Sequence, residues 1–208
     1  MIQSSRTFRV FVSSTFSDLK AERNALQERV FPKLRGLCAQ HGCRFQAIDL
    51  RWGESEEAAL DQQAMRICLE EIERSQKLSP RPNFIILLGD RYGWQPLPYE
   101  IPAAEYDGLI QQIDPAEKAF LEKWYRLDEN AIPPAYDLLP REGKYGEFSA
   151  WEPIEKELLR ILRKGIEKVG LPGNLRLKYF SSATEQEIYK GALDEPGAKE
   201  HVFCFLRQ

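Results

Sequence analysis

The sequence lacks the signals of metal-binding, secreted and membrane proteins. Its four cysteines form no CxxC pair and are accompanied by only two histidines, so we expect no zinc site. No apolar run approaches the roughly 20 residues that span a bilayer, and no signal peptide precedes the first strand pattern. The formal net charge is −3 and no basic block occurs, so nothing indicates nucleic-acid binding. We therefore expect a cytoplasmic protein with neither a nucleic-acid nor a membrane partner.

Familiar phosphate-binding motifs are missing too. No GxGxxG follows the first predicted strand and no GxxxxGKS/T occurs, so neither a dinucleotide fingerprint nor a P-loop is present. A phosphoacceptor receiver domain would need an acidic pair after the first strand, where this chain has serines. The turn SSTFSD resembles a flavin phosphate loop but lacks the glycine of such loops. We expect no permanently bound cofactor.

Strand and helix patterns alternate along the chain, which predicts an α/β fold. Short runs rich in β-branched and aromatic residues predict strands at 7–14, 44–50, 84–88 and 201–206. Apolar stripes with helical spacing predict helices at about 17–40, 61–75 and 183–193, the first with a capping box formed by Thr15 and Asp18. This order favours a parallel sheet with helices on both faces. The run at 84–88 is apolar throughout and suits a central strand.

Between the third and fourth strands the alternation stops. Residues 95–148 hold many of the prolines, several aromatic residues and short helical patterns such as 115–127, which predicts a large insertion or lid. A strong amphipathic helix is expected at 149–169 and a short extended segment at 175–180. We expect a single domain, 1–208, that carries this insertion and forms the N-terminal module of a longer protein.

Polar and aromatic residues gather where three of the predicted strands end. They are Ser13, Ser14, Thr15, Asp49, Arg51, Trp52, Asp90, Arg91, Tyr92 and Trp94. Ligands of open parallel sheets bind beyond the carboxyl ends of the strands. Hydroxyl groups before a helix suit an anion, arginines add charge-assisted hydrogen bonds, and aromatic rings offer faces on which a base stacks. We therefore predict a ligand pocket here. The alternatives are helix caps for the hydroxyls, a local ion pair of Asp90 with Arg91, and core packing of the tryptophans.

Several segments, taken in order, resemble one known family. They are FRVFVSSTFSDLKAERNAL, DLRWG, CLEEIERS and FIILLGDRYGW, followed later by SSATEQEIYKGAL and HVFCFLR. Together they resemble the N-terminal domain of unknown function of STAND NTPases, such as NACHT/WD-repeat, TPR and telomerase-associated proteins. The resemblance implies a TIR-like, flavodoxin-like three-layer sandwich with strand order 2-1-3-4 and a fifth strand beyond it. It also implies a C-terminal NTPase and repeat sensor in the same chain, self-association through TIR-like contacts, and a role in innate immunity or antiphage defence.

Enzymatic TIR domains carry a catalytic glutamate in an SxWCxxEL-like helix, and two stretches of this chain resemble that motif. The match puts Glu187 at the glutamate in SSATEQEI and Glu155 there in SAWEPIEK, although neither stretch has the cysteine. The first helix leads directly into the fourth strand, which is the better topological match. The resemblance thus implies Glu187 as the catalytic residue and Glu155 as the second candidate. Glu185 has capping-box spacing from Ser182, which predicts a structural role for it.

One carboxylate is enough to cleave NAD at its nicotinamide–ribose bond. The reaction passes through an oxocarbenium-like state that a carboxylate stabilises or attacks, and nicotinamide leaves from a cationic ring without a general acid. Hydrolysis of NAD as a substrate is therefore the first hypothesis. A non-catalytic interaction or oligomerisation module is the second, and a nucleoside deoxyribosyltransferase-like enzyme is the third. A cleft that contains Glu187 beside Trp94 would favour an enzyme, whereas a Glu187 in bulk water would favour the interaction module.

Overall fold

The computed structural model describes residues 6–15, 18–50, 62–79 and 81–207, and these divide between two units with separate cores. The first unit combines Met1–Glu54, Ile67–Trp94 and Ser182–Gln208, and the second combines Ser55–Arg66 and Gln95–Ser181. The predicted insertion at 95–148 lies within the second unit. That unit continues to Ser181, so the segment that departs from the parallel sheet is longer than the sequence pattern indicates.

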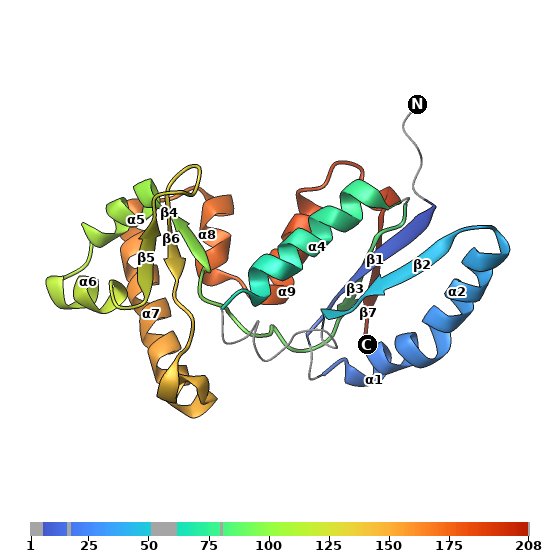
Figure 1. The fold of residues 1–208 in the computed structure, drawn as a ribbon, viewed down its shortest axis with the longest axis horizontal. Helices are drawn as coiled ribbons and strands as arrows, with labels where there is room; N and C mark the ends of the chain where they lie inside the picture. Colours follow the sequence, from blue (N-terminus) through green and yellow to red (C-terminus); the bar gives the residue numbers. More distant parts are fainter. Residues whose placement is uncertain (1–5, 16–17, 51–61, 80, 208) are drawn as a thin grey trace. The chain divides into compact units, whose positions relative to one another are not determined.

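Four parallel strands form the sheet of the first unit (Figure 1). They are β1 (Thr7–Ser13), β2 (Arg44–Ile48), β3 (Phe84–Leu88) and β7 (Val202–Leu206). Their order is β2-β1-β3-β7, and every pairing is parallel. This confirms the α/β class, the parallel sheet and the strand order 2-1-3-4, since β7 is the fourth strand of this sheet along the chain. Within the described ranges the sheet has no fifth strand.

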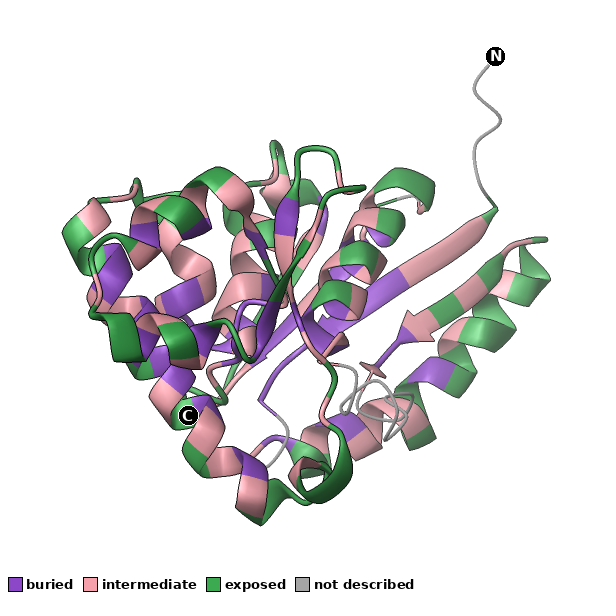
Figure 2. Ribbon diagram, turned by 60° about the vertical axis from the view of Figure 1, so that its left-hand side comes forward, coloured by how far each residue is buried: buried purple, intermediate pink, exposed green. Residues whose placement is uncertain are grey.

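Helices cover both faces of this sheet, as the alternating pattern predicts (Figure 1). They are α1 (Lys20–Ala25), η1 (Leu26–Val30) and α2 (Phe31–Gln40) on one face, and α4 (Ala64–Leu78), α9 (Ala183–Ile188) and η4 (Tyr189–Leu193) on the other. Val12 of β1 packs with Phe31 on the first face, and Phe11 packs with Ile72 on the second. Successive residues of β1 thus point to opposite faces. Figure 2 shows the buried residues along the strands and the exposed residues on the outer surfaces of the helices.

The helix predicted at 17–40 is less regular than its apolar pattern indicates. Its α-helical part starts at Lys20, and the π-helical segment η1 separates α1 from α2. The predicted capping box is wrong, because the Thr15 hydroxyl donates to the Asp18 carboxylate and Leu19 occupies the N-cap position. After the end of α2, Gly42 has a φ of +67°, a left-handed conformation that glycine adopts at low cost.

The last strand, β7, lies at the edge of the sheet and is far more exposed than a core strand. Phe203, Phe205 and Leu206 are 54%, 57% and 67% exposed. The short 3₁₀ turn η5 (Ala198–Glu200) precedes this strand. An apolar run such as VFCFL is typical of a strand buried on both faces, but sequence alone does not distinguish a central strand from an edge strand. The strand expected at 201–206 is therefore present as β7, but it lies at the exposed edge of the sheet and not in the core.

The second unit contains a small antiparallel sheet and helices of its own (Figure 1). Its strands are β4 (Glu100–Pro102), β5 (Tyr125–Asp128) and β6 (Ala135–Leu138), in the order β4-β6-β5. Its helices are α5 (Ala103–Ile110), α6 (Pro115–Leu121), η3 (Gly143–Gly146), α7 (Phe148–Val169) and α8 (Gly173–Phe180). Two predictions are corrected: the helix expected at 115–127 ends at Leu121 before β5, and the segment expected to be extended at 175–180 is part of α8.

Aromatic residues form much of the core of the second unit. The rings of Trp124 and Trp151 meet edge to face with centroids 5.0 Å apart, and those of Tyr106 and Tyr136 stack at 3.8 Å. Tyr179 of α8 is buried and donates its hydroxyl hydrogen to Glu105. This contact orients α8 as a helix against α5, an interaction that the sequence of α8 by itself does not reveal.

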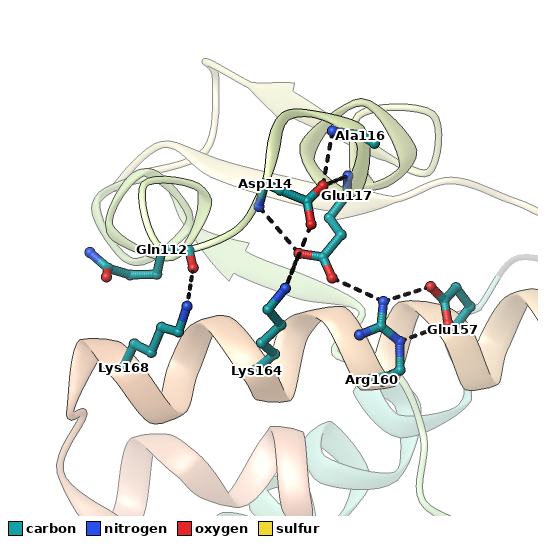
Figure 3. Close-up of polar contacts among 8 residues, drawn as sticks. All are labelled: Gln112, Asp114, Ala116, Glu117, Glu157, Arg160, Lys164 and Lys168. Atoms are coloured by element: carbon teal, nitrogen blue, oxygen red, sulfur yellow. Dashed lines mark hydrogen bonds and ion pairs between the residues drawn. The ribbon is translucent and has the colours of Figure 1, made fainter.

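A cluster of charged residues joins α6 to α7 within the second unit (Figure 3). Asp114 caps α6 by accepting hydrogen bonds from the backbone of Ala116 and Glu117. Lys164 Nζ lies 2.7 Å from Glu117 Oε2, and Arg160 Nη2 lies 3.0 Å from Glu117 Oε1. These donors, Lys164 first, lower the pKa of Glu117 from 4.5 to about 2.

Replacing Glu117 tests this cluster through the pH dependence of stability. The folded-state pKa lies below the ordinary value of 4.5, so the carboxylate stabilises the fold above pH 4.5 and loses this effect as pH falls towards 2. We expect Glu117→Gln to lower the free energy of unfolding at pH 7 by about 1 kcal/mol and the difference from the unmodified protein to shrink below pH 4.5. Urea unfolding at several pH values measures both. Glu152→Gln, which removes an exposed pair with Lys156, is the matched control, and a difference independent of pH would contradict the prediction.

Two glycine substitutions of opposite effect test the packing of the first unit. A Cβ on Gly191 would lie 2.5 Å from the Phe84 ring, whereas a Cβ on Gly36 would meet nothing within 4 Å. We expect Gly191→Ala to lower the free energy of unfolding by about 1–3 kcal/mol, because the ring stacked on Phe11 must move. Gly36→Ala, inside α2, is expected to raise it by about 0.5–1 kcal/mol. Chemical denaturation followed by circular dichroism compares them, and similar effects at the two positions would refute this packing.

Candidate functional site

A cavity of about 360 Å³ lies beyond the C-terminal ends of β1 and β3. It is lined by Ser14, Thr15, Arg91, Gly93, Trp94, Ala183, Thr184 and Glu187. These residues come from the loop after β1, the loop after β3 and helix α9, all within the first unit. In the order β2-β1-β3-β7 the chain proceeds from β1 to β2 on one side and returns to β3 on the other. The cavity thus occupies the point where strand order reverses, which is the usual ligand position in open parallel sheets.

Glu187 brings a carboxylate into this cavity. The residue is 8% exposed, and its Oε2 accepts a hydrogen bond of 2.5 Å from the hydroxyl of Ser13. Ser13 is the last residue of β1 and is fully buried. A hydrogen bond from a buried hydroxyl fixes the orientation of a carboxylate, so β1 itself positions Glu187.

The loop after β3 supplies a cation and an aromatic ring. Arg91 and the half-exposed Trp94 line the cavity together with Gly93. Gly93 has a φ of +94°, and a Cβ there would lie 3.0 Å from Thr15 Cγ2, so a larger residue would be strained and would enter the cavity. The backbone oxygen of Trp94 accepts a hydrogen bond of 2.8 Å from the N–H of Ala183, which joins this loop to the start of α9.

A second, smaller cavity of about 250 Å³ shares part of its wall with the first. It is lined by Thr15, Leu87, Leu88, Gly89, Arg91, Tyr92, Ser182, Thr184, Glu185 and Ile188. Tyr92 donates its hydroxyl hydrogen to Glu185 Oε2, and the Tyr92 hydroxyl oxygen accepts from the N–H of Ser182 at 3.3 Å. Ser182 accepts from the N–H of Glu185 at 3.2 Å. Only half of the predicted capping box is therefore present, and the Glu185 carboxylate lines a cavity.

Beneath the loop after β1, Arg23 holds several groups in place. Its guanidinium donates to Ser14 Oγ at 2.8 Å, to the Val12 carbonyl at 3.3 Å and to the carboxylate of Asp49. Arg23 and Asp49 are both buried. Arg23 is not among the residues predicted for the pocket, although its position carries a signal: it follows Leu19 by four residues and precedes Leu26 by three. A charged residue within an apolar stripe indicates a buried partner.

Charged residues near the rim are paired with one another. Asp90 is exposed, and its carboxylate lies 2.9 Å from the guanidinium of Arg207. Asp18 accepts a hydrogen bond of 3.3 Å from the backbone N–H of Arg91, and the hydrogen bond from Thr15 lowers the pKa of Asp18. Asp90 thus pairs with Arg207, a residue far along the chain. The Thr15–Asp18 contact fixes the rim of both cavities.

The structure brings together most of the residues predicted for the pocket. Ser14, Thr15, Arg91, Trp94 and Glu187 line the first cavity, Tyr92 lines the second, and Ser13 supports Glu187. Asp49 and Asp90 line neither cavity, because each is engaged in an ion pair. Arg51 and Trp52 lie outside the described residues. Glu155 is buried in α7 of the second unit and does not line the cavity. Thr184, which lines the cavity, and Arg23, which supports it, are not among the residues predicted from the sequence.

Neither a metal-binding cluster nor a membrane-spanning helix occurs among the described residues. No group of three or more His, Cys, Asp or Glu residues there has an arrangement that could hold a metal ion. Among those same residues, no helix combines the length and the hydropathy needed to cross a bilayer.

Comparison with known proteins identifies the family. The model of the family described as "Domain of unknown function (DUF4062)" matches residues 9–123, more than half of the chain. The chain belongs to this family. The match spans β1 to α6 and includes Arg91 and Trp94, whereas Glu185 and Glu187 lie after its end.

Several curated relatives are much longer than this chain. NACHT domain- and WD repeat-containing protein 1 of Mus musculus is 34% identical over an alignment of 195 residues, and the match covers 91% of this chain and 12% of that protein. NACHT and WD repeat domain-containing protein 2 of the same species is 30% identical, and the match covers 100% of this chain and 13% of that protein. Telomerase protein component 1 of Rattus norvegicus is 40% identical over 97 residues, 47% of the chain and 4% of that protein. These findings confirm the resemblance to the domain of unknown function. No solved structure matches the chain, so its TIR-like character stays a prediction.

A double-mutant cycle tests the support beneath the site. Arg23→Met leaves the buried Asp49 carboxylate without its guanidinium, so we expect the free energy of unfolding to fall by about 3–5 kcal/mol. The double variant Arg23→Met/Asp49→Asn removes both charges. Its free energy of unfolding is expected to fall by less than the sum of the losses in Arg23→Met and Asp49→Asn. Urea unfolding measures the three variants. Additive losses would mean that the two residues do not depend on each other.

Proposed function

We propose that the first unit of this chain hydrolyses the nicotinamide–ribose bond of NAD, with Glu187 as the catalytic carboxylate. The observation that carries the proposal is the position of Glu187, held by Ser13 inside a cavity whose other walls provide Arg91 and Trp94. Buried carboxylates in a ligand-sized cavity are expensive to maintain unless they are hydrogen-bonded or serve a reaction. Glu187 lies beyond the carboxyl ends of β1 and β3, where open parallel sheets usually bind ligands.

The chemistry needs few groups from the protein. The bond between C1′ and the pyridinium nitrogen breaks, and its electron pair neutralises the ring, so nicotinamide leaves without protonation. The positive charge that develops on C1′ and the ring oxygen is stabilised by the Glu187 carboxylate. A water oxygen then bonds to C1′ and releases one proton, to Glu187 or to solvent, and the products are nicotinamide, ADP-ribose and that proton. Trp94 offers a face for the nicotinamide ring, and Arg91 offers a cation for the pyrophosphate.

The longer relatives suggest the setting in which such a reaction would act. They are NACHT and WD-repeat proteins by name, and the chain covers about an eighth of their length. We propose that this chain is the effector module of a STAND-type protein, with an NTPase and a repeat region in the same polypeptide, and that it acts in innate immunity or antiphage defence. In this view assembly of the NTPase brings several copies of the module together.

Measuring nicotinamide release tests the proposal. Purified protein, as this chain and as the full-length protein, is incubated with NAD, and the products are separated by chromatography. We expect turnover that Glu187→Gln lowers by about 100-fold or more, because the neutral amide stabilises the oxocarbenium charge poorly. Circular dichroism must show that the variant is folded. Absence of nicotinamide from both forms of the protein would refute the proposal.

Glu155→Gln is the matched control for that experiment. Glu155 is likewise a buried glutamate on a helix, but it lies in the second unit and does not line the cavity. Turnover should survive this change. Loss of turnover in Glu155→Gln with full activity in Glu187→Gln would instead assign the reaction to the other candidate.

A second candidate function is a non-catalytic module that associates with itself. The observation in its favour is the edge strand β7, which exposes Phe203, Phe205 and Leu206. An apolar edge strand without charges or proline is a surface to which another strand pairs. The chromatographic experiment separates the two candidates, since an interaction module would release no nicotinamide in any assembled form.

A further inference from the structure

The second cavity has the composition of a nucleoside subsite. Leu87, Leu88 and Ile188 give it apolar surface, and Tyr92 and Glu185 give it polar groups. An apolar site with a few placed polar groups is the usual arrangement for a small ligand, and the two cavities together fall within the roughly 300–1,000 Å³ of such sites. The reaction proposed above uses only the first cavity, because Glu187 does not line the second.

The wall that the two cavities share contains a cation. Thr15, Arg91 and Thr184 line both of them. A molecule that occupies both cavities therefore passes the Arg91 side chain and the Thr184 hydroxyl, whereas the Thr15 hydroxyl already donates to Asp18. Guanidinium and hydroxyl groups suit the oxygen atoms of a phosphate or pyrophosphate. A dinucleotide has this order of parts: one nucleoside, a pyrophosphate, and a second nucleoside.

Within the second cavity, Glu185 presents a carboxylate with one oxygen already engaged. Tyr92 donates to Oε2, and no described residue donates a hydrogen bond to Oε1. A carboxylate whose orientation is fixed by a phenol suits a ligand that brings hydroxyl groups of its own. In dinucleotide-binding proteins an acidic side chain accepts a hydrogen bond from the ribose 2′-hydroxyl. The same carboxylate opposes a phosphate on that position, because two negative charges would meet at short distance.

From this arrangement we infer that Glu185 is a specificity-determining residue: it binds the 2′-hydroxyl of the adenosine ribose, and the site thereby selects NAD over NADP. The inference rests on the proposed function for the identity of the substrate, and it adds a residue and a selectivity to it. Tyr92 is the positioning residue that holds the Glu185 carboxylate. The nicotinamide half lies in the first cavity beside Glu187, and the adenosine half lies in the second.

Binding measurements test the inference without relying on turnover. NAD and NADP are titrated by calorimetry into the Glu187→Gln protein and into the same protein carrying Glu185→Gln. We expect NAD to bind at least about tenfold more tightly than NADP in the first protein, since the carboxylate rejects the 2′-phosphate. With Glu185→Gln the ratio of the NADP to the NAD dissociation constant should fall below about threefold, mainly through tighter binding of NADP. The glutamine amide oxygen still accepts a hydrogen bond from Tyr92 but does not repel a phosphate.

A matched control removes a carboxylate elsewhere in the same unit. Glu73→Gln lies on α4, where Glu73 pairs with Lys77, and it lines neither cavity. The NAD preference should be unchanged in this variant, and a change as large as that of Glu185→Gln would overturn the inference.

The possible outcomes separate the inference from the proposed hydrolysis. Equal affinities for NAD and NADP before the substitution, binding of neither, or an unchanged ratio in Glu185→Gln would each overturn the subsite. Nicotinamide release with equal affinities would keep the hydrolase and remove the subsite. A preference for NAD that depends on Glu185 in a protein that releases no nicotinamide would keep the subsite and remove the hydrolase.

Discussion

The buried ion pair of Arg23 with Asp49 is the contact on which the geometry of the site depends. Asp49 directly follows β2, and Arg23 lies on α1 and donates to Ser14 and to Val12 at the end of β1. One guanidinium therefore joins the C-terminal ends of two neighbouring parallel strands. Burying two charges is costly unless each is neutralised and hydrogen-bonded. An arrangement that meets this condition leaves the strand ends little freedom to move.

Strand order then explains why the cavity forms where it does. The connections from β1 to β2 and from β2 to β3 place their helices on opposite faces of the sheet, so the loops after β1 and β3 separate at the edge. Helix α9 closes one side of the resulting opening through two hydrogen bonds. The N–H of Ala183 donates to the Trp94 carbonyl, and the Ser13 hydroxyl donates to the Glu187 carboxylate. Both cavities described above lie on this edge. Glu187 lines the first cavity, Glu185 lines the second, and Arg91 lines both. These two carboxylates and one cation suit a ligand that carries both hydroxyl groups and an anionic centre.

The second unit is stabilised by interactions that are independent of this site. Its core consists largely of tryptophan and tyrosine rings, and its helices α6 and α7 are connected through Glu117, Arg160 and Lys164. The sequence indicates this region by the interruption of the β–α alternation and by the helical pattern of α7, but it does not indicate the small sheet. Its strands have three or four residues each, too few for a periodic pattern to distinguish them from a loop. Tyr179 shows the same limit, because its partner Glu105 is far away in sequence.

The spacing of apolar residues was enough to predict the parallel sheet and the helices on its faces. The polar and aromatic residues at the ends of the predicted strands were enough to predict the edge at which they gather. These features depend on side-chain order along short segments, and each segment carries its own hydrophobic signal. Only the tertiary structure decided which of those polar residues share a cavity. Asp90 pairs with Arg207, and Asp49 pairs with Arg23. The Glu185 carboxylate accepts a hydrogen bond from Tyr92 instead of completing the capping box. The physical reason is that a carboxylate takes the nearest donor in space, and the donors in these three contacts come from distant parts of the chain.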